Sequence, residues 1–461
     1  MSSSWVEAEV GRSIFKDKRI NGRFLKICEK VAENIGSTIP DSCQNWGLTK
    51  GTYRFLGNER IEEAEILQGH FLSVKERFDA CDGPVLILHD TTEFSYKKND
   101  TSKLEKIRTI RLARQYSKGM YDSIEHKISG ILMHASVAAT PEGLPLGLTS
   151  VKYWTRKKFK GARALYKKVN ATRIPIEEKE SIRWLQNLQQ TDFLLQNPEK
   201  CVHIGDREND IYEFFCEASF LKTNFVIRAS VDRLAEECTL SEIIALEEAK
   251  FSKEITFTDE NGNEITTEIE VKYKTIEVHP PNGKEDQYES LVLTFINATE
   301  LKNPEGRPKL NWNLITNINT SSSKKIWELI SWYKKRWTVE IFFKILKMIC
   351  GAEQSKLRTS NRLARLISIL SIMAWRIHWI TMMARQAIET AIDVVFEKTE
   401  QKILEKINKK RKLKTIREYL YSLAQLGGYL ARKSDAAPGP HVIWRGLMRL
   451  ADIQRGFELA T

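Results

Sequence analysis

The sequence lacks the cysteine patterns of a metal-binding or disulfide-stabilised protein. Its seven cysteines are scattered along the chain, none forms a C-x-x-C pair, and no histidine lies near one at the spacing of a zinc site. Structural zinc and a disulfide framework are therefore not expected. The pattern favours free, mostly buried thiols in a reducing cytosol.

The chain also lacks a predicted signal peptide and a predicted membrane span. Its first residues, MSSSWVEAEVGRSIFKDKR, contain no apolar stretch of the kind that a signal peptide needs. The most hydrophobic run, residues 366–384, is interrupted in its middle by Arg376 and His378. Because a central arginine is costly in a bilayer, we expect a buried helix there and a protein without membrane contact.

Internal repeats and long low-complexity segments are absent from the sequence, and its composition is that of a folded protein. Hydrophobic residues make up 42% and aromatic residues 9% of the 461 residues, which suits about two to four domains rather than a disordered chain. The formal net charge is +12, which favours an anionic partner such as nucleic acid. A cationic surface on a cytosolic enzyme is the alternative.

Residues 1–65 are predicted to be helical and rich in basic side chains. Apolar residues recur at helical spacing through residues 15–35, with basic residues between them. The basic residues form two groups, which are Lys16, Lys18, Arg19, Arg23 and Lys26, and then Lys50, Arg54 and Arg60. Such a pattern is typical of a small helical DNA-binding module, and also of a solvated basic face.

The middle of the chain predicts a sheet with helices between its later strands. Three strands in series, at residues 83–96, 127–140 and 144–154, indicate an antiparallel meander. A helix, a short strand ending at Asp206, a second helix and a strand over residues 223–230 follow, which gives the order β-β-β-α-β-α-β. Residues of about 230–312 interrupt this alternation with further strands, including a hairpin around Asn261-Gly262. The chain from residue 323 onward is mostly helical by its pattern, so we expect an α/β (α+β) multidomain fold.

Three carboxylates are candidates for metal binding. Asp90 and Asp206 follow predicted strands, where polar groups of an α/β sheet converge, and Glu340 lies on a predicted helix over residues 333–347. Three carboxylates without histidine or cysteine suit a hard cation such as Mg²⁺, and two such ions promote an in-line displacement at phosphorus. Taken singly, each aspartate also fits a turn or helix cap, and Glu340 also fits a surface ion-pair ladder with Arg336 and Lys344.

The helix that carries Glu340 is predicted to be largely buried, since apolar residues are spread nearly all round it. Its polar residues form one narrow stripe, which consists of Tyr333, Arg336, Glu340, Lys344 and Lys347. A charged stripe on a buried helix is expected to face a cleft or a polar ligand. A phosphate backbone beside a metal would need both the acidic Glu340 and the basic residues of this stripe. The role of Lys344 stays open.

These residues resemble the signature of the IS4 family of bacterial DDE transposases. Tyr333, Arg336, Glu340 and Lys347 match the family's Y-x-x-R-x-x-x-E-x-x-x-x-x-x-K spacing. HDTTEFSY and GDREND resemble the segments that hold the family's two catalytic aspartates. The segments TYRFLGN, WNLITN, LGGYL and WRGLMRL extend the likeness over the length of the chain.

The resemblance implies an RNase H-like catalytic core flanked by helical domains. The implied domains are residues 1–65 for recognition of transposon ends, 66–386 for catalysis with the β insertion at about 230–312, and 387–461 for dimerisation. Asp90, Asp206 and Glu340 would bind Mg²⁺ or Mn²⁺, with two ions in each active site.

DNA contacts are implied for a larger set of residues, which are Tyr333, Arg336, Lys347, Trp312, Arg207, Arg228, Arg19, Arg23 and Arg54. Trp312 would stack near a flipped base, although a tryptophan in a core strand is the alternative. The segment DKRINGR resembles an end-recognition helix with two adjacent arginines, and here Ile20 stands in place of the second.

The implied activity is cut-and-paste transposition of double-stranded DNA by a cytoplasmic bacterial enzyme, bound to the nucleoid through DNA and acting as a homodimer. Water would free a 3′-OH at the transposon boundary, this group would form a hairpin that water reopens, and the freed 3′-OH would attack target DNA. Two alternatives stay open. One is a metal-dependent nuclease on the same fold, and the other is a non-catalytic end-binding inhibitor of transposition.

Overall fold

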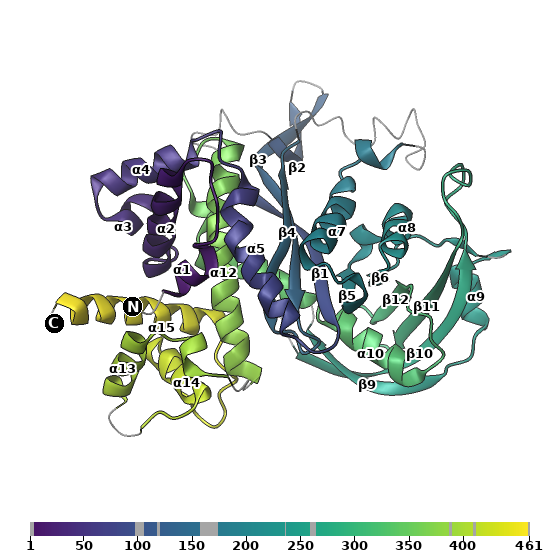
Figure 1. Ribbon diagram of the computed structural model, residues 1–461. Coiled ribbons are helices and arrows are strands. Elements are labelled where there is room, and N and C mark those ends of the chain that lie inside the picture. The colour runs from purple at the N-terminus through teal and green to yellow at the C-terminus, as the bar shows by residue number, and fades with distance from the viewer. Residues whose placement is uncertain are drawn as a thin grey trace.

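A computed structural model describes residues 4–96, 106–117, 120–156, 174–235, 237–258, 264–386, 390–408 and 412–459. A large mixed sheet forms one side of the molecule, and helices from the two ends of the chain gather on the other side, along the long helix α12 (Ser360–Gln386) (Figure 1). Both chain ends lie on this helical side (Figure 1). The arrangement confirms the predicted multidomain α+β fold class.

The central strands follow the predicted order. The antiparallel meander consists of β1 (Val85–Tyr96), β3 (Met120–Ala139) and β4 (Pro145–Trp154). The strands β5 (Cys201–Gly205) and β6 (Asn224–Arg228) extend the sheet in parallel with β1, through the helices α7 (Ile182–Leu195) and α8 (Tyr212–Phe220). Because helices cover both faces, β5 is buried throughout.

One strand was missed by the sequence prediction. β2 (Lys106–Ser117) pairs antiparallel with the first half of β3, beyond the half that pairs with β1. Its sequence, KIRTIRLARQYS, has basic residues among the apolar ones, so it carries no clear strand alternation.

The inserted strands continue the central sheet and do not form a separate one. β12 (Asn311–Thr316) pairs antiparallel with β6, and β11 (Leu291–Glu300), β10 (Glu264–Val278) and β9 (Phe251–Thr258) follow outward. The predicted hairpin pairs β9 with β10, and its turn at Asn261-Gly262 lies outside the described residues. The short strands β7 (Leu234–Ala235) and β8 (Cys238–Thr239) and the helix α9 (Leu240–Leu246) complete this end of the sheet.

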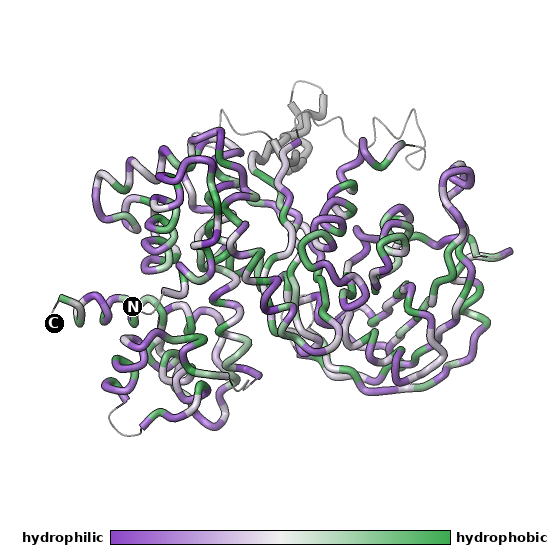
Figure 2. The backbone as a smooth tube through the Cα atoms, viewed as in Figure 1, coloured by the Kyte–Doolittle hydropathy of each residue, from purple (hydrophilic) through white to green (hydrophobic). Residues whose placement is uncertain are grey.

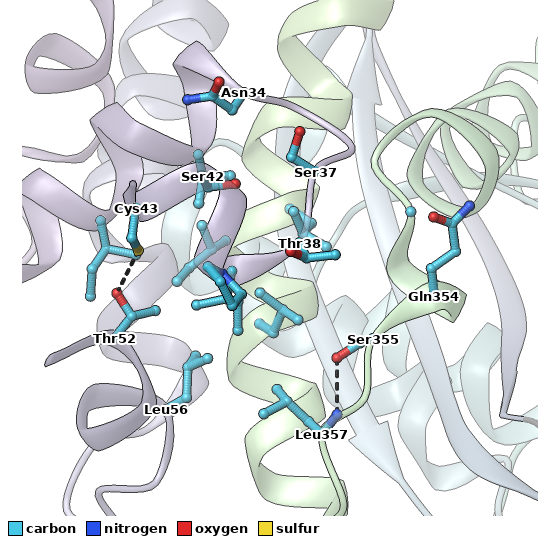
Figure 3. A pocket seen from close by; sticks show the side chains of 18 of the residues that line it. Asn34, Ser37, Thr38, Ser42, Cys43, Thr52, Leu56, Gln354, Ser355 and Leu357 are labelled. Atoms are coloured by element: carbon cyan, nitrogen blue, oxygen red, sulfur yellow. Dashed lines mark hydrogen bonds between the residues drawn. The ribbon is translucent and has the colours of Figure 1, made fainter. Parts of the chain in front are cut away.

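The N-terminal helices are α1 (Trp5–Val10), α2 (Lys18–Glu33), α3 (Ile39–Cys43) and α4 (Trp46–Leu56). Side-chain caps start all four of them, and in the two longest Asp17 accepts from the Arg19 amide of α2 and Asn45 accepts from the Leu48 amide of α4. They meet α12 around a cavity of about 200 Å³, whose lining includes Leu56 and Leu357 (Figure 3).

The C-terminal helices are α13 (Lys398–Ile407), α14 (Ile416–Leu426) and α15 (Pro440–Leu459). α14 and α15 pack against the other half of α12, and α13 packs against these two helices (Figure 1). The indole of Trp444 on α15 donates to the Ile35 carbonyl at 3.0 Å. The two terminal helical groups are therefore in direct contact.

Helix α12 is the buried helix that the sequence predicts. It is long and apolar enough to cross a membrane, but its most hydrophobic 18-residue window is 94% buried inside the protein, and Figure 2 shows hydrophobic residues along it. Arg376 is accommodated because its guanidinium lies over the rings of Trp5 and Trp379 and donates to the Val395 carbonyl at 2.6 Å.

A buried ionic cluster joins α1 to α5 (Glu63–Asp79), the helix that leads from the N-terminal group to the sheet. Arg77 donates to both oxygens of Glu9 at 2.8 and 3.0 Å and to the Leu146 carbonyl of β4 at 2.7 Å. His70 contacts the same carboxylate through Nδ1 and accepts from the Leu148 amide through Nε2. Burial alone would raise the pKa of Glu9, but His70 and Arg77 hold it at about 2.

Removing the charge of Glu9 should strongly destabilise the protein. Glu9→Gln leaves the partly buried Arg77 without its counter-ion, so we expect a loss of about 2–4 kcal/mol in the free energy of unfolding, measured by urea denaturation. The matched control is Glu76→Gln on α5, the helix that carries Arg77. This change breaks the solvent-exposed pair between Glu76 and Arg12 and should cost at most about 1 kcal/mol. Equal losses in the two variants would contradict this account of the cluster.

Candidate active site

The three candidate carboxylates meet where β1 and β5 separate. The ladder between these strands ends at the pair of Leu88 and Ile204, so Asp90 and Asp206 lie just beyond its last rung. Asp206 is also the cap of a short 3₁₀ turn, because its side chain accepts from the Glu208 amide at 2.9 Å. Glu340 comes from α11 (Trp337–Lys344), which packs against β1.

The three carboxylates influence one another's ionisation. Burial raises the pKa of Asp90 to about 7, and the charges of Asp206 and Glu340 add to this effect, while Arg336 opposes it. The pKa of Glu340 is raised by burial and by Asp206, again against the opposing effect of Arg336. The structure therefore brings together all three carboxylates that the sequence singled out.

The helix around Glu340 differs from the continuous one that the sequence predicts. α10 (Ser323–Lys334) ends before Lys335, Arg336 lies in the joint, and α11 begins at Trp337. A π-helical turn over Ile345–Ile349 follows, closed by the Cys350 amide donating to the Ile345 carbonyl at 3.0 Å. Interruptions of this kind concentrate at functional sites, because they re-aim side chains.

Arg336 is the cation of the site. Its Nη1 lies 3.5 Å from Oδ2 of Asp90, and its Nη2 pairs with Oε1 of Glu340. The sequence pattern also allowed an ion pair between Arg336 and Glu340 in a surface ladder. The ion pair is present, but it is partly buried and Arg336 also contacts Asp90. Lys344 is exposed and, within the described residues, has no ion-pair partner.

The donor set suits a hard divalent cation, because carboxylate oxygens are the ligands that Mg²⁺ prefers. As the side chains stand, no group of three His, Cys, Asp or Glu residues in the described part of the chain is close enough to hold an ion. The guanidinium of Arg336 contacts both Asp90 and Glu340, so these two carboxylates share one cation.

Three of the expected DNA-contact residues gather beside Asp206. Burial raises the pKa of the Tyr333 phenol on α10, while the charges of Arg336 and of Arg228 on β6 oppose this effect. The Trp312 ring, on β12, meets the Tyr333 ring edge-on with a centroid separation of 5.2 Å. Trp312 is half-buried against the core, so it combines a packing role with an exposed part.

Lys347 and Arg207 flank the same site. Lys347 belongs to the π-helical turn, and its Nζ lies 5.5 Å from the centroid of Phe94 on β1. Arg207 is exposed on the 3₁₀ turn that Asp206 caps. Both are therefore near the carboxylates without contacting them.

The remaining expected DNA contacts, Arg19, Arg23 and Arg54, lie elsewhere. They are exposed on α2 and α4, and the contacts of α12 place it between these helices and the sheet (Figure 1). Arg23 approaches α4, since a Cβ atom on Gly51 would be 3.7 Å from its Nε. The two helices thus present one basic face that is separate from the carboxylates.

Sequence reasoning missed a buried hydrogen-bond chain behind the carboxylates. Nε2 of His89 meets Nδ1 of His203 at 2.7 Å, Nδ1 of His89 meets the Ser136 hydroxyl at 2.9 Å, and Asn187 donates to that hydroxyl at 2.9 Å. Burial lowers the pKa of both histidines, that of His89 to about 3. Each neutral ring can then donate through one nitrogen and accept through the other, so the chain runs in one direction.

This chain links β3, β1 and β5 on the face of the sheet opposite Asp90. His89 precedes Asp90 in the strand, and alternate residues point to opposite faces. The bond between His89 and His203 spans β1 and β5 next to the last rung of their ladder, so it restrains how far apart Asp90 and Asp206 lie. The only sequence signal was the presence of histidine in both strands.

Comparison with protein families gives three matches along the chain. Residues 2–61 match a transposase DNA-binding model, residues 182–376 match a transposase DDE domain, and residues 372–461 match a transposase Tn5 dimerisation domain. The DDE match includes Asp206 and Glu340, while Asp90 lies before it in the chain.

The raised pKa of Asp90 predicts a pH-dependent gain in stability for Asp90→Asn. An acid whose pKa rises from 3.8 to about 7 on folding stabilises the protein fully below pH 4, and this contribution is lost as the pH rises through 7. Without DNA and with chelator, the variant should therefore match the wild type in Tm near pH 4 and exceed it increasingly up to pH 8. Asp82→Asn, which changes an exposed residue before β1, is the control and should show no such trend. A pH-independent difference for Asp90→Asn would contradict the prediction.

Proposed function

Since the chain is a transposase with the Tn5-like architecture of the IS4 family, we propose that it cuts transposon ends and pastes them into target DNA. The observation that supports this best is the meeting of Asp90, Asp206 and Glu340 in one partly buried place. The basic and aromatic residues around them suit a phosphate backbone and an unstacked base.

The assignment of regions follows the same logic. The chain binds DNA and has a dimerisation region. We infer that residues 1–65 recognise the transposon ends, that residues 66–386 with the insertion at 230–312 carry catalysis, and that residues 387–461 hold two copies together in a synaptic complex. Arg19, Arg23 and Arg54 would contact the end DNA, because they form an exposed basic face. The enzyme would act in the bacterial cytoplasm, where its DNA is.

Transposases of the DDE class generally use divalent metal ions. For this chain we infer two Mg²⁺ or Mn²⁺ ions held by Asp90, Asp206 and Glu340, which when bound would supply Lewis-acid stabilisation for displacement at phosphorus. Arg336, Lys347, Arg207 and the pair of Tyr333 and Arg228 would grip phosphates through charge-assisted hydrogen bonds.

The proposed reaction sequence combines two hydrolyses by water with two exchanges of phosphodiester bonds by the 3′-OH. Water attacks the phosphodiester at the boundary and frees a 3′-OH. That hydroxyl attacks the opposite strand and forms a hairpin, water reopens the hairpin, and the 3′-OH then attacks target DNA. Because the reacting groups are positioned by the protein, no covalent protein–DNA intermediate is required.

Neutralising any one of the three carboxylates should abolish cutting. Asp90→Asn, Asp206→Asn and Glu340→Gln should each lower Mg²⁺-dependent cleavage of a duplex with the element's terminal inverted repeat by about a thousandfold or more. Binding of the same duplex, measured by gel shift, should remain, and Glu76→Gln on α5 should cut normally. Full cleavage by any one carboxylate variant would refute the assignment, while wild-type cutting without joined products would indicate a nuclease.

Loss of the Trp312 side chain should act mainly on the hairpin step. Stacking of a base on an aromatic ring is worth roughly 1–3 kcal/mol, so Trp312→Ala should reduce hairpin formation by about tenfold or more and leave nicked ends to accumulate. Trp312→Phe should retain most of the activity. The control is Trp327→Ala, because Trp327 on α10 contacts Lys253 instead. Equal hairpin yields in Trp312→Ala and the wild type would exclude base capture by Trp312.

A further inference from the structure

The contacts of Arg336 point to control of the active site by DNA. We propose that in the DNA-free protein Arg336 holds Asp90 and Glu340 and so keeps divalent ions out, and that a phosphate of the transposon end draws it away and admits the ions. This inference rests on the proposed function, because it takes these carboxylates to be the metal ligands. It adds an order of events, in which DNA comes before metal.

The first support is competition for the same two carboxylates. Arg336 contacts Oδ2 of Asp90 and Oε1 of Glu340, and an ion held by these residues would need the negative charge of both groups. Only 18% of the arginine side chain, 17% of the Asp90 side chain and 30% of the Glu340 side chain are exposed. In this partly desolvated place a guanidinium and a divalent cation repel each other strongly, so the two occupants exclude each other.

The second support is the position of Arg336 in the chain. It lies in the joint between α10 and α11, where the Lys335 and Arg336 amides bond to the Trp332 and Tyr333 carbonyls in tight turns. Because the joint leaves the two helices packed on either side, the arginine side chain can change partners by rotating its own torsions. The backbone that carries Glu340 does not have to move.

The third support is what lies next to the joint. Tyr333 is three residues away, and the positive charge of Arg228 acts on its phenol. A phosphate bound there would receive donors from Arg228 and Tyr333 and would offer Arg336 a bidentate partner. The positive guanidinium of Arg336 would then leave the carboxylates and pair with the DNA phosphate. The divalent ions would replace it only after an end has been bound.

The test measures Mn²⁺ binding to the full-length protein without DNA, by electron paramagnetic resonance of the free ion. If the form without the arginine contact is populated to about a tenth or less in the wild type, Arg336→Gln should bind Mn²⁺ about tenfold more tightly or better. Lys335→Gln is the matched control, because it removes the adjacent positive charge, which instead donates to the Glu142 carbonyl, and it should leave the affinity unchanged. Arg336→Lys, which can hold one carboxylate but not both, should fall between.

DNA supplies the second arm of the experiment. A duplex that stops at the transposon end, so that no first cut is possible, should raise the Mn²⁺ affinity of the wild type by about the same factor, while Arg336→Gln should show no such increase. The proposed control by Arg336 would be overturned if Arg336→Gln bound Mn²⁺ no more tightly than the wild type. The metal-ligand assignment would still stand if Asp90→Asn abolished Mn²⁺ binding in both proteins. If Asp90→Asn in the Arg336→Gln background does not weaken Mn²⁺ binding, the carboxylates are not the ligands and the proposed function fails instead.

Discussion

Like charges repel strongly where water is partly excluded, and the separated ends of β1 and β5 hold two carboxylates beside a third from α11. Such a cluster is relieved by protonation of one carboxylate or by a nearby cation. In the DNA-free chain this cation is the guanidinium of Arg336, which contacts Asp90 and Glu340 at once. The proposed roles of divalent ions and DNA phosphates both depend on this balance, because each would change which charge Arg336 meets.

The scaffold behind the carboxylates must be rigid for such a balance to be specific. Helices cover the sheet, and on the face away from Asp90 a chain of neutral side chains links β3 to β1 and β5 through His89 and His203. Every member of the chain is buried and partnered, which makes a polar network stabilising rather than costly. The inserted strands extend the same sheet through β12, so Trp312 reaches the site from a continuous framework.

The DNA-binding and dimerisation regions connect to this framework through α12. Its buried Arg376 stacks between Trp5 and Trp379, and the cluster of Glu9, His70 and Arg77 joins the first helix to β4. The contact between Trp444 and the Ile35 carbonyl also links α15 directly to the end of α2. The two terminal helical regions are therefore held to the sheet and to each other by packed side chains and hydrogen bonds.

Local patterns in the sequence determined much of this protein. The apolar runs that end at Asp90 and Asp206 gave the right strands, the interrupted hydrophobic run gave the buried α12, and the spacing from Tyr333 to Lys347 singled out Glu340. These signals are local because strands and helices have fixed periods. Tertiary structure alone decided the break at Lys335 and Arg336, the pairing of β2 and the continuity of the sheet into the insertion. It also decided that Arg336 meets Asp90, 246 positions away, and that His89 meets His203. Contacts between distant residues depend on how the strands are ordered and where they separate, and neither is encoded in the periodicity of any one segment.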